Sequence, residues 1–321
     1  MKTNIFTWEE MFIPSRQIKG IRITRIDPKE EYVMVPDMID GLPVLELGPY
    51  VLEGSMIREL ELPSGLERIG RYAFYNCEHL EKIRIPEGMK DIGSGAFTGA
   101  HRIKEISLLV PEENKKLVVL QEILMDVVEA VKINMLFPET EEVREIRLVF
   151  PAYYEEGVEN TPARNITSEY YGTGLKFRNC IVGRQMQYEE YDKLFQLAAS
   201  VEEPELVLEM ALMRLLYPYK LKDVYREGYQ NWIRQEAEEI LPALIEEKRL
   251  DDLKFILEEI EIDSETRNKA AILCAEKGFA AAVSLFMDKE TKETVSDSEV
   301  LSDEMQTTGP VVQSIFDLDE I

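Results

Sequence analysis

Histidine and cysteine, two residue types common among metal ligands and catalytic nucleophiles, are scarce in this sequence. Its 321 residues include two histidines and three cysteines. Cys77 and His79 lie two positions apart, but a zinc site needs three or four converging ligands. His101 comes 22 positions after His79, which does not match the 23-residue repeat described below, so the two histidines are not equivalent. We therefore predict no metal site and no cofactor.

Other patterns that support catalysis are also weak. No serine or cysteine has a recognisable base close by in the sequence, as nucleophilic catalysis would need. The segment Gly172-Thr173-Gly174 lacks the Gly-Lys-Ser/Thr continuation of a phosphate-binding loop. The 62 acidic residues are so numerous that no carboxylate pair can be singled out as a general acid and base. We therefore predict that the chain is not an enzyme. The alternative is an unrecognised site within residues 109–185.

The clearest pattern is an internal repeat whose copies begin at Ile57, Leu80 and Ile103. The segment IRELELP at 57–63 aligns with LEKIRIP at 80–86, and IGRYAF at 69–74 aligns with IGSGAF at 92–97. The third copy, IKEISL, occupies 103–108. In each copy, apolar residues two positions apart point to one face of a short strand, and neighbouring copies must stack to bury these faces. A period in the low twenties with this spacing predicts a solenoid.

Two further features recur within the copies. Gly70 and Gly93 occupy equivalent positions and indicate a bend with little room for a Cβ atom. The pairs Ala73-Phe74 and Ala96-Phe97 follow them. Each pair supplies one small and one large side chain for the opposite wall of the solenoid.

The pattern Ile-Pro-x-Gly-x-x-x-Ile-Gly-x-x-Ala-Phe in residues 85–97 resembles the BspA-type leucine-rich repeat of bacterial proteins. Cys77 ends the first full copy, where that family often has cysteine. The resemblance covers residues 20–108, with 20–55 as an irregular N-terminal repeat, and it stops after Leu108. It implies a solenoid with short parallel β-strands, which offers a binding or scaffolding surface and no chemistry.

Changes in composition divide the chain into three expected parts and give an α+β fold. Residues 1–185 form the leucine-rich repeat domain, in which apolar residues at helical spacing predict an inserted helix near 114–132. A further repeat strand, VREIRLVFP, is expected at 143–151. Residues 186–290 form an α-helical repeat domain. Residues 291–321 are acidic and polar, which predicts a disordered tail, because such a segment cannot bury enough apolar surface to fold alone.

The helical part contains a second internal repeat, with an offset of 30 positions. Residues 244–257 align with 274–287 through shared apolar positions, and Lys248 aligns with Gly278. The second copy, over residues 270–285, resembles the helix-turn-helix core of an ankyrin repeat. It lacks the Thr-Pro-Leu-His start of that repeat, so a generic repeat of helical pairs is the alternative.

The composition restricts the partners and the cellular compartment. The formal net charge is -25, so phosphate backbones and anionic membranes would be repelled, and a neutral or basic protein partner is easier to accommodate. No apolar run approaches the ~20 residues of a membrane span, and the first residues lack the apolar stretch of a signal peptide. Three cysteines, odd in number and far apart, indicate reduced thiols. We therefore expect a cytoplasmic protein that binds neither nucleic acid nor membrane.

The residues that flank the buried strand positions should form ladders on the outer face of the solenoid. Their charge alternates from copy to copy, and such cross-strand pairs contribute about 0.2–1 kcal/mol each. The alternative interpretation is a polar docking face. Tyrosine and methionine are enriched at interfaces, so the first pair is the most suggestive. The expected outward pairs are Tyr32 and Met34, Glu59 and Glu61, Lys82 and Arg84, and Glu105 and Ser107.

Two segments outside the strands are also candidates for contact. The tyrosine-rich segment 153–171 is expected either to cap the open end of the solenoid or to serve as an aromatic contact loop. The tail ends in a short apolar motif. This motif is disordered, folds back on its own helical domain, or docks as a helix in the groove of a partner. The residues that would anchor such a helix are Val312, Ile315, Phe316 and Leu318.

Together these patterns predict a non-catalytic intracellular protein that binds or scaffolds another protein. Its repeat surfaces and tethered tail would act together, because linked sites raise one another's effective concentration. The alternative is a regulatory subunit of a larger machine, such as an ATPase or a defence complex, which would need an obligate partner. The identity of the partner and the oligomeric state do not follow from the sequence.

Overall fold

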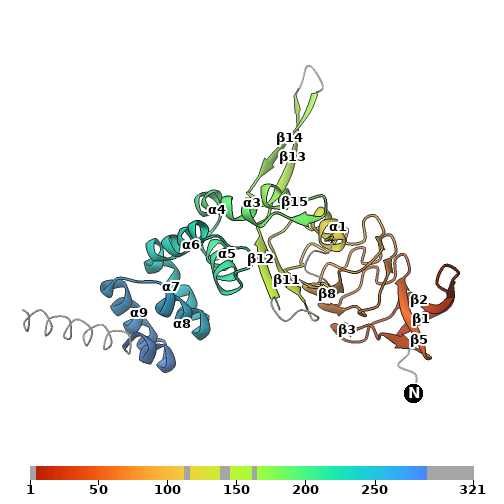
Figure 1. The fold of residues 1–321 in the computed structure, drawn as a ribbon, viewed down its shortest axis with the longest axis horizontal. Coiled ribbons are helices and arrows are strands. Elements are labelled where there is room, and N and C mark those ends of the chain that lie inside the picture. The colour runs from red at the N-terminus through yellow and green to blue at the C-terminus, as the bar shows by residue number, and fades with distance from the viewer. Residues whose placement is uncertain (1–4, 112–115, 138–144, 161–164, 288–321) are drawn as a thin grey trace, which may run out of the picture. The chain divides into compact units, whose positions relative to one another are not determined.

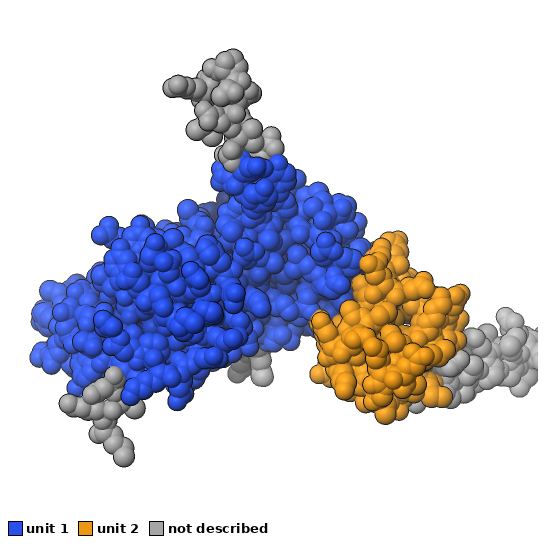
Figure 2. Space-filling view, turned by 180° about the vertical axis from the view of Figure 1, so that it is seen from behind, with its two compact units in different colours: residues 1–232 blue, residues 233–321 orange. Residues whose placement is uncertain are grey.

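The computed structural model describes residues 5–111, 116–137, 145–160 and 165–287. Contacts between Cα atoms divide the chain into two compact units, unit 1 with residues 1–232 and unit 2 with residues 233–321 (Figure 2). Unit 1 contains the solenoid and the first helices that follow it in the sequence. The domain boundary expected after residue 185 falls inside unit 1, and the expected division into three domains stays a prediction.

One ladder of the solenoid, which we call sheet B, has the strand order β3-β6-β8-β10-β11-β12 (Figure 1). The strands from β3 to β11 are parallel. Leu60, Ile83 and Ile106 lie opposite one another in consecutive strands and are buried, which confirms the expected register. The strands are β3 (Tyr32–Met34), β6 (Glu59–Glu61), β8 (Lys82–Pro86), β10 (Glu105–Leu109), β11 (Val131–Leu136) and β12 (Glu145–Phe150).

The second ladder, sheet A, has the order β1-β2-β5-β7-β9, and β4 pairs with β5. Strand β1 is antiparallel to β2, whereas β2, β5, β7 and β9 are parallel. Each coil of the repeat therefore gives one short strand to each sheet. The strands are β1 (Phe6–Ile13), β2 (Ile18–Ile26), β4 (Met38–Ile39), β5 (Leu42–Leu47), β7 (Arg68–Ile69) and β9 (Asp91–Ile92).

The interior of the solenoid is filled as the repeat predicts. The pairs Ala73-Phe74 and Ala96-Phe97 are at most 1% exposed, and the two phenylalanine rings lie 5.0 Å apart. A Cβ atom on Gly93 would lie 2.3 Å from a main-chain atom of the preceding coil, and one on Gly70 would lie 2.4 Å from such an atom. The bend with little room for a Cβ is therefore confirmed at both glycines.

Helix α1 (Val118–Asp126) interrupts the repeat between β10 and β11. Its first turn is held by Glu87, whose fully buried carboxylate accepts hydrogen bonds from the main-chain N–H groups of Val119 (2.8 Å) and Leu120 (3.2 Å). The first N–H groups of a helix lack partners inside it, so Glu87 satisfies two of them. The inserted helix is shorter than the expected segment 114–132, whose last residues instead begin strand β11.

The strand expected at 143–151 exists as β12, but its direction corrects the expectation. It pairs antiparallel to β11 and does not continue the parallel ladder. Strand β11, which the 23-residue spacing does not predict, is the next parallel member after β10.

A buried tyrosine covers the edge of β12. The hydroxyl of Tyr191, in helix α3 (Tyr188–Lys193), donates to the Val149 carbonyl at 2.6 Å and accepts from the Val149 N–H at 3.1 Å. Its ring lies 5.8 Å from that of Phe150 and 4.9 Å from that of Phe177. An edge strand presents unpaired main-chain groups, and Tyr191 satisfies both groups of Val149. Helix α3 therefore covers the last strand of sheet B through this side chain.

The tyrosine-rich segment forms a hairpin of β13 (Tyr154–Asn160) and β14 (Asn165–Tyr171), which pair only with each other in the part of the chain that is described. Tyr154 and Tyr171 stack with their ring centres 5.0 Å apart and are 55% and 43% exposed. The hairpin extends away from both sheets (Figure 1). The cap expected from this segment is therefore wrong, and the aromatic contact loop stays a prediction.

Two buried arginines organise the rest of unit 1. Arg214 donates two hydrogen bonds of 2.8 Å to the carboxylate of Asp192, which also accepts one of 2.8 Å from the Tyr229 hydroxyl. Arg178 donates to five main-chain carbonyls, those of Leu124, Val127, Glu129, Pro151 and Gly174. Burial lowers the pKa of Arg178 to about 10. The remaining elements are α2 (Gly174–Arg178), β15 (Ile181–Val182), β16 (Gln185–Met186), α4 (Phe195–Val201), α5 (Pro204–Leu216) and α6 (Asp223–Gln235), whose last three residues are assigned to unit 2.

Unit 2 contains α7 (Ala237–Glu246), α8 (Leu250–Glu259), α9 (Ser264–Glu276) and helical residues up to 287. The 30-residue repeat is visible in its turns, because Lys248 and Gly278 both have left-handed backbones, with φ of 56° and 67°. After each of them, the next main-chain N–H bonds to a carbonyl five residues earlier, at 2.9 and 2.8 Å. Two helical pairs thus share one turn geometry. Their resemblance to ankyrin repeats is not confirmed.

Candidate binding surface

The outward side chains of sheet B form the ladders that the sequence predicts. One ladder reads Tyr32, Glu59, Lys82 and Glu105, and the other reads Met34, Glu61, Arg84 and Ser107. All eight side chains are exposed or half-buried. The four candidate residues Tyr32, Met34, Lys82 and Arg84 therefore lie on one face, separated only by strand β6, over about 10 Å at the usual strand spacing.

Most charges on this face are paired along the ladders. The Tyr32 hydroxyl donates to Glu61 at 3.0 Å, and Arg84 lies 3.4 Å from the same carboxylate. Lys82 lies 3.5 Å from Glu59. Burial and the hydrogen bond to Glu61 raise the pKa of Tyr32. Such half-exposed pairs contribute about 0–1 kcal/mol each, so the alternating charges support neighbouring strands and also leave a nearly neutral polar face.

The far end of the face is covered by side chains from the following helices. Lys132 of β11 bonds to Glu209 of α5 at 2.6 Å. The guanidinium of Arg147 in β12 lies 4.2 Å from the centre of the Tyr217 ring. Asn134 lies opposite Ser107 and so extends the second ladder by one strand, and its side chain donates to Glu105 at 2.8 Å. The residues of β11 could have been found from the alternation in VKINML, but the helix before it breaks the repeat spacing.

The opposite end of the face is open and apolar. Tyr32 is 45% exposed and Met34 is 56% exposed. Both lie on β3, which is the edge strand of sheet B among the described residues. Their exposure at a sheet edge keeps these two residues as candidates for contact with another chain. The remaining candidates, Val312, Ile315, Phe316 and Leu318, lie outside the described residues.

The histidines and cysteines do not come together. In the described part of the chain no group of three His, Cys, Asp or Glu side chains could hold a metal ion. His79 is half-buried and His101 is exposed. The three cysteines are buried and unpaired. Burial raises the pKa of the Cys77 thiol to about 11, and its sulfur lies 3.1 Å from the Leu52 carbonyl.

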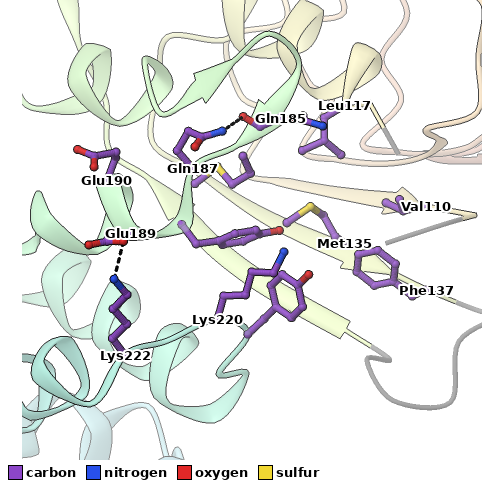
Figure 3. Close-up of a pocket in the computed structure, with 13 residues that line it drawn as sticks. Val110, Leu117, Met135, Phe137, Gln185, Gln187, Glu189, Glu190, Lys220 and Lys222 are labelled. Atoms are coloured by element: carbon purple, nitrogen blue, oxygen red, sulfur yellow. Dashed lines mark hydrogen bonds and ion pairs between the residues drawn. The ribbon is translucent and has the colours of Figure 1, made fainter. Parts of the chain in front are cut away.

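A pocket that the sequence does not reveal lies where strands β10 and β11 end (Figure 3). We call it the strand-end pocket; its volume is about 470 Å³. Its floor is apolar and its rim is polar. The Lys222 amine bonds to Glu189 at 2.7 Å and lowers the pKa of that carboxyl. The lining residues are Val110, Leu117, Met135, Phe137, Gln185, Met186, Gln187, Tyr188, Glu189, Glu190, Tyr219, Lys220 and Lys222.

A family comparison identifies the repeat. Residues 44–117 match a family model described as the BspA type Leucine rich repeat region (6 copies). The match supports a repeat solenoid of this type over residues 44–117, as the resemblance implied. The match does not extend to the hairpin or to the helices of either unit. A comparison with curated proteins gives no match.

Solved structures match about a third of the chain. A leucine-rich repeat protein from Bacteroides capillosus is 24% identical over 33% of this chain and 80% of its own, with a TM-score of 0.29. A leucine rich cell surface protein from Faecalibacterium prausnitzii is 20% identical over 34% of this chain, with a TM-score of 0.28, and this chain spans 32% of it. A T. pallidum leucine rich repeat protein is 24% identical over 34% of this chain and 71% of its own, with a TM-score of 0.24. TM-scores this low support no conclusion about the fold or the function of this chain. No helix in the described ranges has the length and apolarity that crossing a bilayer requires.

Proposed function

We propose that the chain is a non-catalytic protein that binds another protein through the outer face of sheet B. The observation that carries this proposal is the pair of exposed side chains, Tyr32 and Met34, at the open edge of that face. The paired charges of the next rungs would form a polar rim around them, which is the usual anatomy of an interface. Repeat arrays of this kind offer extended surfaces to partners.

The charge of the chain favours a neutral or basic partner. The formal net charge is -25, and a strongly acidic partner would be repelled before contact. Lys82 and Arg84 are already paired with Glu59 and Glu61. They would therefore orient a partner rather than supply most of the affinity.

The proposal is tested by removing the apolar pair from the full-length protein. The double variant Tyr32→Ser, Met34→Ser is expected to capture about one tenth as much of a specific partner as the wild type, or less. The reason is that a few buried apolar side chains usually dominate the affinity of an interface. The measurement is quantitative mass spectrometry of proteins captured by the tagged chain in its native host.

The matched control replaces two equally exposed apolar side chains elsewhere in unit 1. Met56 is 66% exposed and Met125 is 68% exposed, and neither lies on the outer face of sheet B. The variant Met56→Ser, Met125→Ser is expected to capture the partner as the wild type does. Equal capture by the wild type and the Tyr32, Met34 variant would contradict the proposal.

We also infer that the protein works in a reducing compartment, which supports the expectation of a cytoplasmic location. Its three cysteines are buried as free thiols, whereas chains of oxidising compartments usually pair them. Fractionation of the native host tests this inference, and recovery of the chain at the cell surface would contradict it.

A further inference from the structure

The first strand of the solenoid exposes an edge that the proposed function does not use. Strand β1 is the outermost strand of sheet A, and in the described part of the chain it pairs only with β2. It is eight residues long and contains no proline. Trp8 is 40% exposed and Phe12 is 53% exposed. A long edge strand with exposed apolar side chains is a template for pairing with another chain.

The hydrogen bonds of β2 show which main-chain groups of β1 are used inside the sheet. The Ile23 carbonyl of β2 accepts a hydrogen bond of 2.7 Å from the Gly48 N–H, so the main chain of Ile23 faces the next coil. The preceding residue, Arg22, therefore faces β1, where it lies opposite Glu9. Glu9 thus directs its main-chain groups into sheet A.

Every second residue of β1 has the opposite orientation. From Trp8 to Ile13 the register with β2 is regular, so the main-chain groups of Trp8, Glu10 and Phe12 point to the open side. In an antiparallel pair centred on Glu10, Trp8 of one copy would lie opposite Phe12 of the other, and this aromatic pair would occur twice. Aromatic cross-strand pairs stabilise a sheet. The open edge of β1 is therefore complementary to a second copy of itself.

The charges at this end of the chain permit such a contact, although the formal net charge of the chain is -25. Residues 1–40 contain six basic and seven acidic residues, so this part is nearly neutral. Exposed charges more than about 8 Å apart are largely screened at physiological salt. Glu10 lies 3.4 Å from Lys19, and Glu9 lies 2.9 Å from Arg22. The two Glu10 carboxylates at the centre of the pair would therefore each have a cation of their own chain beside them.

We propose that two copies of the chain pair antiparallel through β1, about a two-fold axis at Glu10, and so join their two sheets A into one continuous sheet. A contact that uses the same surface on both copies closes on itself and gives a dimer. Trp8 and Phe12 supply its apolar contacts, and the outward main-chain groups of β1 supply its hydrogen bonds. This inference does not rest on the proposed role of sheet B.

The mass of the full-length protein in solution tests the proposal. Sedimentation equilibrium at about 50 µM is expected to give twice the chain mass of 37.1 kDa. Glu10→Pro removes an outward N–H group and leaves the ladder with β2 intact, so it is expected to give the mass of one chain. The double variant Trp8→Ser, Phe12→Ser is expected to weaken the dimer at least about tenfold. Circular dichroism verifies that each variant is folded.

The matched control removes two similarly exposed apolar side chains at the edge of sheet B. The variant Tyr32→Ser, Met34→Ser is expected to remain a dimer, so the dimer and the proposed role of sheet B can fail separately. The proposal would be overturned by a wild type with the mass of one chain at about 50 µM. A dimer that the β1 variants leave unchanged, or that the Tyr32, Met34 variant dissociates, would also overturn it.

An engineered cysteine tests the register of the pair. Residues opposite each other in a hydrogen-bonded antiparallel pair have Cα atoms about 5.5 Å apart, which suits a disulfide. Glu10→Cys is therefore expected to form a disulfide between two copies under mild oxidation, measured on a non-reducing gel. The three native cysteines are buried.

The control for this crosslink is Thr7→Cys, at an exposed residue of the same strand. In the proposed register its two copies lie about 20 Å apart, which is too far for a disulfide. Equal crosslinking at positions 7 and 10, or no crosslinking at position 10, would overturn the proposal.

Discussion

At the scale of single residues, neighbouring coils of the solenoid approach one another closely at a repeated glycine. A Cβ atom on Gly93 would lie 2.3 Å from the nitrogen and 2.6 Å from the Cα of Arg71. These are main-chain atoms, which cannot rotate away as a flexible side chain can. The two coils must therefore separate, or the bend must shift, before any larger residue fits.

Replacing this glycine is expected to destabilise the solenoid. The variant Gly93→Ala should lower the free energy of unfolding by about 1–3 kcal/mol, the usual effect of overpacking a tight contact. Urea denaturation followed by circular dichroism measures this change. The matched control is Gly88→Ala, since a Cβ on Gly88 meets nothing within 4 Å. It should change the stability by less than about 0.5 kcal/mol, and an equal loss in both variants would contradict the explanation.

The repeat predicts the glycine bends, but it does not predict the left-handed backbone conformation of residues beside them. Two residues after Gly48, Gly70 and Gly93 the backbone has positive φ, with values of 56° at Tyr50, 55° at Tyr72 and 67° at Gly95. Only the glycine would suggest such a conformation, because a bulky residue in the left-handed region is unusual. The stacking of the Tyr50 and Tyr72 rings, 5.4 Å apart, accompanies the two exceptions. The two tyrosines occupy equivalent positions of neighbouring coils, so the repeat brings them together, but it does not predict their backbone conformation.

At the scale of secondary-structure elements, Tyr191 links a helix to the last strand of sheet B. Its hydroxyl is hydrogen-bonded to both main-chain groups of Val149, and its side chain is fully buried. Burial raises the pKa of this hydroxyl. The hydroxyl therefore stays protonated across the physiological range and remains able to donate.

Removing this hydroxyl is expected to destabilise the last strand of sheet B. Tyr191→Phe should lower the free energy of unfolding by about 1–3 kcal/mol, because two buried main-chain groups lose their partner. Amide exchange at Val149, measured by NMR, should accelerate more than exchange at other positions of β12. The variant Tyr225→Phe, at a half-buried tyrosine of α6, is the control and should have little effect. Unchanged exchange at Val149 would contradict the capping role.

The repeat spacing predicts the register of some strands of sheet B and fails for others. Leu60, Ile83 and Ile106 follow one another at the repeat spacing, and the register of their strands is as the repeat predicts. The same spacing would place the next member at Glu129, whereas Ile133 of β11 lies opposite Ile106, because α1 has been inserted. The antiparallel direction of β12 was also beyond prediction, since alternating apolar residues fit either direction of pairing. The strand-end pocket depends on β11, which is why the sequence does not reveal it.

At the scale of the whole molecule, the net charge determines which large partners the chain can meet. Its formal net charge is -25. Binding to DNA or RNA depends mainly on Lys and Arg that neutralise phosphates. Three cations of sheet B that the structure describes, Lys82, Arg84 and Lys132, are each paired with a carboxylate of the same chain.

We therefore expect no measurable affinity for polyanions. A labelled DNA duplex of about 30 base pairs and vesicles rich in anionic lipid should show no binding at about 50 mM salt, where electrostatic attraction would be strongest. Gel shift and co-sedimentation measure the two cases, with a basic protein of similar size as the positive control. Binding that weakens steeply as salt is added would contradict this expectation.

The repeating coil of the solenoid has a consequence for how such a protein can evolve. Each coil adds one strand to each of the two sheets and meets its neighbours only through stacking. An in-frame duplication of one coil would therefore lengthen the outer face by about 4.8 Å, while the glycine bends continue to fit and the helices still close the far end. The outer face therefore grows one coil at a time. Related proteins that differ in coil number could bind partners of different width while the packing inside each coil stays the same.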